Sequence, residues 1–128
     1  MLPLSVFIIT KNEEARLPRT LEAVVEWAGE IIVADSGSSD RTVDIAKAYE
    51  ATVIHRQFAG YGNQGLCAEQ RCRYDWVLNI DSDEVVTTDL RAEIMYILVM
   101  NAHVFWNMTT TLFVFITVRL HPIAVTSS

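Results

Sequence analysis

The chain has 128 residues, a length that suits one domain with a substantial hydrophobic core. Sixteen acidic residues against ten basic ones give a formal net charge of −6, and no cluster of Lys or Arg stands out, which argues against nucleic acid as a partner. The cysteines, Cys67 and Cys72, have no Cys or His neighbours at metal-ligand spacing, so we expect reduced thiols rather than a structural zinc site.

The N-terminal part predicts a strand, a helix and a second strand. There is no basic leader, so the apolar run 5–10 is interpreted as a first strand rather than as a signal peptide. Pro18 suits a first helical turn, and apolar spacing predicts a helix that continues to Trp27 and is ended by Gly29. Residues 30–35 then form a second buried strand that finishes in an aspartate.

The alternation of strand and helix continues after a serine-rich loop. Ser39 or Asp40 is expected to cap the next helix. The further predicted elements are a helix at 41–50, a strand at 52–56, a glycine-rich loop at 59–63 and a weak helix at 64–73. This alternation with short links predicts an α/β fold, with a mostly parallel, doubly wound sheet flanked by helices.

The apolar run 75–80 predicts another buried strand, and Asp81, Ser82, Asp83 and Glu84 follow it. Ligands of open α/β sheets bind beyond the carboxyl ends of the strands. Strand alternation places Asp81 and Asp83 on one side, where a Mg²⁺ or Mn²⁺ ion would offset their repulsion. The alternative interpretation is a polar strand end that leads into a helix cap.

A helix is predicted from Thr88 to Ile94, capped by Thr87 or Thr88, and the character of the chain then changes. Residues 94–118 contain no Asp, Glu, Lys or Arg, a length that exceeds the roughly 20 residues of a membrane span. Polar side chains near the centre of this segment favour packed core segments, with a strand at 112–118, over a transmembrane helix. His121 is expected in a loose terminus.

Three blocks of sequence resemble the family 2 glycosyltransferases of the GT-A fold. The blocks are Leu4 to Glu14, Glu30 to Thr42 and Asp75 to Glu84. Their order and content look most like the lipopolysaccharide core β-glucosyltransferases of Gram-negative bacteria. The resemblance covers residues 4–94, so we divide the chain into a nucleotide-sugar-binding half, 1–94, and an apolar tail, 95–128, that looks truncated or divergent.

The resemblance implies an inverting transfer of sugar from a nucleotide-diphosphate donor, UDP-glucose, to a lipopolysaccharide core or related glycan or glycolipid. It implies Mg²⁺ or Mn²⁺ as cofactor, and a location in the cytoplasm or, through peripheral association, at the cytoplasmic face of the inner membrane. The implied site residues are Thr10, Asn12 and Glu14 beside the nucleotide, Asp35 on the base, Asp81 on the ribose or metal, and Asp83 on the metal.

The sequence departs from the family pattern in two places. The segment 64–67 lacks the usual basic residue, for which Arg71 or Arg73 is a candidate substitute. No Asp or Glu follows Glu93, so the catalytic base is not identified, and the alternative to an active enzyme is a non-catalytic remnant that binds donor weakly or not at all. An Asp-x-Asp phosphatase is disfavoured, because its carboxylates would have to follow the first strand.

Overall fold

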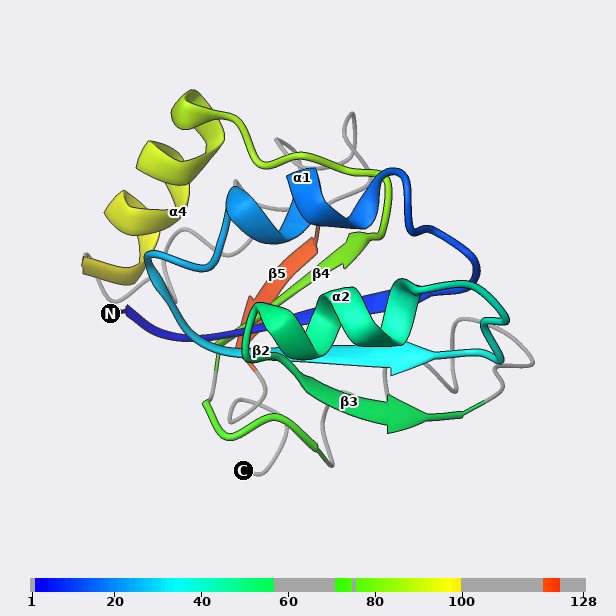
Figure 1. Cartoon of the computed structure of the whole chain (residues 1–128). Coiled ribbons are helices and arrows are strands. Elements are labelled where there is room, and N and C mark those ends of the chain that lie inside the picture. Colours follow the sequence, from blue (N-terminus) through cyan, green and yellow to red (C-terminus); the bar gives the residue numbers. More distant parts are fainter. Residues whose placement is uncertain (1, 57–70, 75, 100–118, 123–128) are drawn as a thin grey trace.

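The computed structural model describes residues 2–56, 71–74, 76–99 and 119–122. Strands and helices alternate from residue 2 to residue 55 and again from residue 76 to residue 99, as predicted (Figure 1). The elements are β1 (Leu2–Thr10), α1 (Leu17–Glu22), β2 (Ala28–Asp35), α2 (Thr42–Ala48), β3 (Thr52–His55), β4 (Trp76–Asp81), α4 (Thr88–Val99) and β5 (Arg119–Pro122).

The strands form one sheet in the order β3-β2-β1-β4-β5. The first four strands, β1 to β4, run parallel to one another, whereas β5 is antiparallel to β4. The predicted α/β fold with a mostly parallel sheet is therefore confirmed. Because the chain builds β2 and β3 on one side of β1 and then places β4 on the other, the order reverses between β1 and β4. Such a reversal is the point at which open α/β sheets bind ligands.

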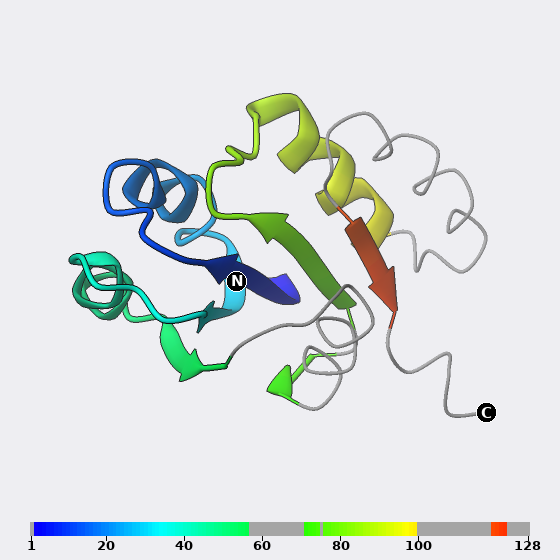
Figure 2. The same cartoon turned by 90° about the vertical axis from the view of Figure 1, so that its right-hand side faces the viewer.

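The core explains why β1 occupies the centre of the sheet. Leu4, Val6 and Ile8 on one face of β1 are fully buried in the cluster that contains the apolar side chains of α1, α2 and α4. Phe7 lies in a second cluster on the opposite face. Figure 2 shows the three helices on the same side of the sheet. Each such Leu or Ile contributes about 1.5–3 kcal/mol through burial, so the central strand is held firmly on both faces.

The first helix is shorter than predicted. α1 ends at Glu22, and the chain continues in turns such as the one in which the Trp27 amide donates to the Val24 carbonyl at 3.2 Å. The apolar spacing misled the prediction, because these turns bury the same side chains that a longer helix would bury. Gly29 does not end a helix but lies within β2, where a Cβ atom would come within 2.5 Å of the Leu2 carbonyl oxygen.

One of the predicted helix caps is identified. The N-cap of α2 is Arg41, without a side-chain cap, rather than Ser39 or Asp40, although Asp40 accepts a hydrogen bond from the Thr42 amide at 2.9 Å. Thr87 accepts from the Leu90 amide at 3.1 Å and caps α4. α4 continues to Val99, beyond the predicted end at Ile94.

The structure corrects one prediction in the C-terminal part. His121 lies in β5, opposite Val77 of β4, rather than in a loose terminus. The predicted loop 59–63, most of the helix 64–73 and the strand 112–118 lie outside the described residues. Within the described ranges, no helix is both long enough and apolar enough to cross a membrane.

Candidate active site

The carboxyl ends of the parallel strands bring the predicted site residues to one edge of the sheet. Thr10 of β1 pairs in register with Asp35 of β2, which pairs in turn with His55 of β3. Asp81, the last residue of β4, pairs with Ile9. The candidate site therefore spans the ends of four adjacent strands and includes the switch point between β1 and β4.

Thr10 brings a buried hydroxyl to this edge. The residue is 2% exposed, and its Oγ1 atom has no hydrogen-bond partner among the described residues. Its carbonyl accepts from the Ser36 amide at 2.9 Å, which joins the ends of β1 and β2. An unsatisfied buried polar group costs about 1–3 kcal/mol, so this hydroxyl is a strong candidate for contact with a ligand.

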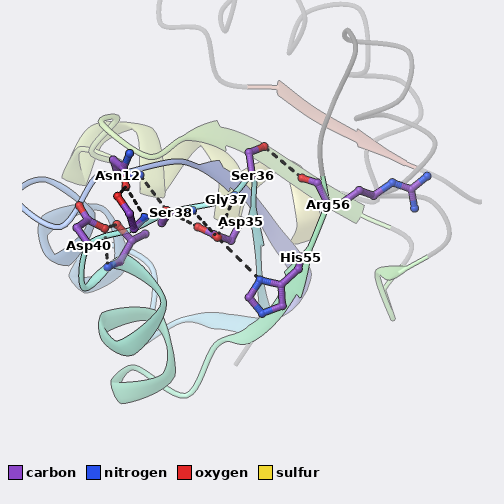
Figure 3. Close-up of polar contacts among 10 residues, drawn as sticks. Asn12, Asp35, Ser36, Gly37, Ser38, Asp40, His55 and Arg56 are labelled. Carbon is purple, nitrogen blue, oxygen red and sulfur yellow. Dashed lines mark hydrogen bonds and ion pairs between the residues drawn. The ribbon is translucent and has the colours of Figure 1, made fainter.

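Asn12 joins the loop after β1 to the loop after β2. Its backbone has a φ of +53°, a left-handed conformation that Asn tolerates better than most residues. Its amide donates to Ser38 Oγ at 2.9 Å, and its Oδ1 atom accepts from the Ser39 amide at 2.8 Å (Figure 3). Nearby, the Glu14 amide donates to Asp40 Oδ2 at 3.3 Å. Both predicted residues, Asn12 and Glu14, thus hold the two loops together.

Asp35 is buried, at 2% exposed, and organises the loop that follows β2. Its Oδ2 atom accepts from the amides of Gly37, at 3.2 Å, and Ser38, at 2.9 Å, and its Oδ1 atom accepts from Ser38 Oγ at 2.5 Å. Gly37 has a φ of +103°, which permits this tight turn. The His55 Nδ1 atom lies 3.9 Å from Asp35 Oδ2 (Figure 3).

Three carboxylates gather in the turn after β4. Asp81, Asp83 and Glu84 have oxygen atoms that all lie within 4.8 Å of one another. β4 ends at Asp81, so a turn rather than strand alternation brings Asp83 beside it, and the Glu84 amide donates to the Asp81 carbonyl at 3.0 Å. Burial raises the pKa of the Asp81 carboxyl, and the negative charges of Asp83 and Glu84 raise that pKa further.

Arg16 connects this acidic turn to the loop after β1. Its guanidinium makes a paired contact with Glu13, at 2.7 Å from Nε to Oε2 and 2.9 Å from Nη2 to Oε1. Its Nη1 atom lies 3.9 Å from Asp83 Oδ2. Both Arg16 and Asp83 are more than half exposed, so this ion pair adds little stability but places a positive charge beside the carboxylates.

The family model described as "Glycosyl transferase family 2" matches residues 5–105, which is most of the chain. The chain belongs to glycosyl transferase family 2. Among curated proteins, it is 50% identical over 97 residues to an uncharacterized glycosyltransferase of Rickettsia typhi, covering 76% of this chain and 33% of that protein. It is 38% identical over 95 residues to the lipopolysaccharide core biosynthesis glycosyltransferase LpsC of Rhizobium meliloti, covering 70% of this chain and 35% of that protein.

The chain is also similar to solved structures of glucosyl-3-phosphoglycerate synthase from Mycobacterium tuberculosis. The complex with Mn²⁺, UDP and phosphoglyceric acid has a TM-score of 0.61 at 27% identity and covers 74% of this chain and 38% of that chain. The complex with Mn²⁺, UDP-glucose and phosphoglyceric acid has a TM-score of 0.55 at 27% identity, with 64% and 35% coverage. The fold of the chain thus matches the N-terminal part of the GT-A fold, and the chain spans about a third of the length of the curated relatives it matches.

The acidic turn of this family member has the chemistry that a hard divalent cation requires. Mg²⁺ and Mn²⁺ prefer oxygen ligands, and three carboxylates within 4.8 Å of one another offer such ligands. Burial and, after it, the charges of Asp83 and Glu84 raise the pKa of Asp81, and a bound cation would favour the ionised carboxylate. The residues therefore fit a metal ion, with Asp81 and Asp83 as the ligand candidates that the sequence predicted and Glu84 as an additional one.

Sequence reasoning missed the roles of several residues at this site. The i,i+3 spacing of Glu13 and Arg16 is a sequence signal for their pairing, but nothing local connects Arg16 to Asp83. His55 lies next to the end of the predicted strand 52–56 and is the last residue of β3, which is the one clue to its place at the site. Arg73, one of the two proposed substitute cations, lies near the opposite end of the sheet from the candidate site. There its backbone amide donates a hydrogen bond to Glu30 Oε1 at 2.7 Å.

Proposed function

We propose that this chain is the donor-binding part of an inverting glycosyltransferase that uses a nucleotide-diphosphate sugar, UDP-glucose, together with Mg²⁺ or Mn²⁺. The observation that carries the proposal is the cluster of Asp81, Asp83 and Glu84 at the β1/β4 switch point. The loop after β2, which Asp35 organises, lies on the other side of β1. The similarity to an enzyme solved with Mn²⁺ and UDP-glucose supports the choice of metal and donor. The similarity to LpsC supports a lipopolysaccharide core or related glycan as the acceptor.

Each predicted residue has a role in this proposal. Asp83 holds the cation, with Asp81 beside it on the cation or on the ribose. When bound, the cation supplies positive charge to the diphosphate as the glycosidic bond breaks. The Thr10 hydroxyl donates to the nucleotide, and Asp35 accepts an N–H group of the base. Asn12 and Glu14 keep the loop after β1 in place against the nucleotide.

The proposal extends to the organisation and location of the protein. Residues 1–94 are proposed as the nucleotide-sugar-binding unit, and residues 95–128 as a segment of separate character. α4 and β5 add described structure on the C-terminal side of residue 94. The lipopolysaccharide-related similarity supports a location in the cytoplasm or at the cytoplasmic face of the inner membrane, with peripheral association with that membrane.

Titration calorimetry with UDP-glucose, in Mn²⁺ and then in excess chelator, tests donor binding. We expect binding in Mn²⁺, and loss of that binding in chelator and in Asp83→Asn. Glu93→Gln is the matched control, because it removes one exposed carboxylate from α4 and leaves the acidic turn intact. Equal binding with and without chelator, or equal loss in both variants, would contradict the metal-dependent assignment.

A transfer assay separates an active enzyme from a donor-binding remnant. We expect this chain by itself to transfer sugar well below the usual enzyme range, because residues 94–128 contain no Asp or Glu to act as the base and a base contributes about 10²–10⁴ in rate. The assay uses radiolabelled UDP-glucose with lipopolysaccharide core acceptors. Turnover of about 1 s⁻¹ or more would show that the base comes from elsewhere in the chain.

A further inference from the structure

A pocket of about 300 Å³ lies at the ends of β2 and β3, lined by Asp35, Ser36, Gly37, His55 and Arg56. Asp35 and His55 are register partners on adjacent parallel strands, so their side chains lie on the same face of the sheet. Figure 3 shows the imidazole of His55 turned toward Asp35, whereas the guanidinium of Arg56 extends away from it. His55 is therefore the side chain of β3 that faces the Asp35 carboxylate.

The hydrogen bonds of Asp35 leave it with one acceptor position. A carboxylate has about four lone-pair sites. Two on Oδ2 are used by the amides of Gly37 and Ser38, and one on Oδ1 is used by the Ser38 hydroxyl. The remaining site on Oδ1 can accept one N–H group from a ligand in the pocket.

His55 offers a donor near the Asp35 carboxylate. Its Nδ1 atom lies 3.9 Å from Asp35 Oδ2, which is too long for a hydrogen bond, and no hydrogen bond from the ring is present within the described part of the chain. The imidazole side chain is 70% exposed, so a ligand can reach it. The pocket thus presents an acceptor on a fixed, buried carboxylate and, next to it, a donor on an accessible ring.

We propose that His55 is a specificity-determining residue that, beside Asp35, selects a uracil base over a cytosine base. Uracil has an N3–H donor next to the O4 acceptor, which matches Asp35 and His55 in turn. Cytosine has an N3 acceptor next to an N4–H donor, which places acceptor against acceptor and donor against donor. This inference rests on the proposed function, because it assumes that a nucleotide donor occupies the pocket.

The test compares UDP with CDP by titration calorimetry in Mn²⁺, using the full chain and two variants. His55→Phe keeps a ring of similar shape without a donor, and His55→Asn places an amide N–H near the position of Nδ1. We expect His55→Phe to weaken UDP binding about 5- to 30-fold and to leave CDP binding nearly unchanged. We expect His55→Asn to retain most of the preference for UDP.

The outcomes separate this inference from the proposed function. If the unmodified chain does not bind UDP in Mn²⁺, the proposed function fails, and this inference fails with it. If the chain binds UDP but His55→Phe keeps the same ratio of UDP to CDP affinity, or loses both affinities equally, only the role of His55 is overturned.

GDP is a third ligand, since guanine has the same N–H and carbonyl pair, and tighter binding of GDP than of UDP would overturn the choice of uracil. Mn²⁺ titrated alone should bind equally to all three proteins, because His55 lies outside the acidic turn.

Discussion

Thr20 of α1 donates its hydroxyl hydrogen to the carbonyl of Ser82, with 2.8 Å between Oγ1 and O and a separation of 62 positions in the sequence. Both residues are buried. Ser82 lies between Asp81 and Asp83, so this bond fixes the acidic turn against the first helix. The position of the candidate metal ligands therefore depends on a side chain from a distant part of the chain.

Replacing Thr20 with Val should loosen the acidic turn, because Val keeps the shape of Thr but leaves the Ser82 carbonyl buried without its partner. We expect a loss of about 1–3 kcal/mol in the free energy of unfolding and weaker Mn²⁺ binding. Thr20→Ser is the matched control, since it retains the hydroxyl. Urea denaturation and Mn²⁺ titration measure the two effects, and Val and Ser variants that bind Mn²⁺ equally well would contradict the positioning role.

Asp81→Asn should stabilise the metal-free protein at pH 7 and should reduce the rise in melting temperature that Mn²⁺ causes. Burial and the charges of Asp83 and Glu84 raise the pKa of Asp81 in the native state. The stability associated with this group is fully present below the ordinary Asp pKa of about 3.9 and is lost as the pH rises through the higher native value. At neutral pH the ionised carboxylate is therefore destabilised by burial and by repulsion from Asp83 and Glu84, and Asn removes both effects.

Thermal melting across a pH series measures this effect. The melting temperature of Asp81→Asn should exceed that of the unmodified chain at pH 7, and the difference should shrink as the pH falls toward 4. Mn²⁺ should raise the melting temperature of the unmodified chain more than that of the variant. Asp44→Asn, in α2, is a control for removal of a carboxylate elsewhere. A variant that is less stable than the unmodified chain at pH 7 would show that repulsion does not dominate.

Asn12 can be tested with a pair of substitutions that separate backbone shape from side-chain bonding. Asn12→Gly keeps the left-handed φ of +53° at little cost but removes the acceptor for the Ser39 amide. Asn12→Ala removes that acceptor and adds a backbone cost of about 1–2 kcal/mol. We expect Ala to destabilise the protein more than Gly in urea denaturation, and the reverse order would contradict the strained geometry of this loop.

Gly29→Ala should destabilise the sheet near the start of β2. An added Cβ would lie 2.5 Å from the Leu2 carbonyl oxygen and 2.8 Å from Cε2 of Tyr74. The tyrosine ring can rotate away, but the carbonyl belongs to the backbone of β1, so a strand has to shift. We expect a loss of about 1–3 kcal/mol, as for overpacked cores, measured by urea denaturation. Ala23→Gly in the turn after α1 is a control for the general effect of exchanging Gly and Ala.

The sequence predicted the strands and their polar ends well, because both signals are local. A strand buried on both faces is a continuous apolar run, so β1, β2 and β4 were recognisable, as was the carboxylate at the end of two of them. The alternation with helices then required a mostly parallel sheet. The candidate metal residues Asp81 and Asp83 followed from this local pattern together with the family resemblance.

The tertiary structure determined which residues of the site lie next to one another. The strand order sets Asp35 against His55 and Thr10, and the packing of α1 on the sheet brings Thr20 to Ser82. The same packing limits α1 to six residues, although the apolar spacing that predicted a longer helix is present. Such contacts join residues far apart in the chain, and they depend on register and on close packing between layers. Local propensity contains no information on either, which is why the sequence determined the parts of this site and the fold determined their geometry.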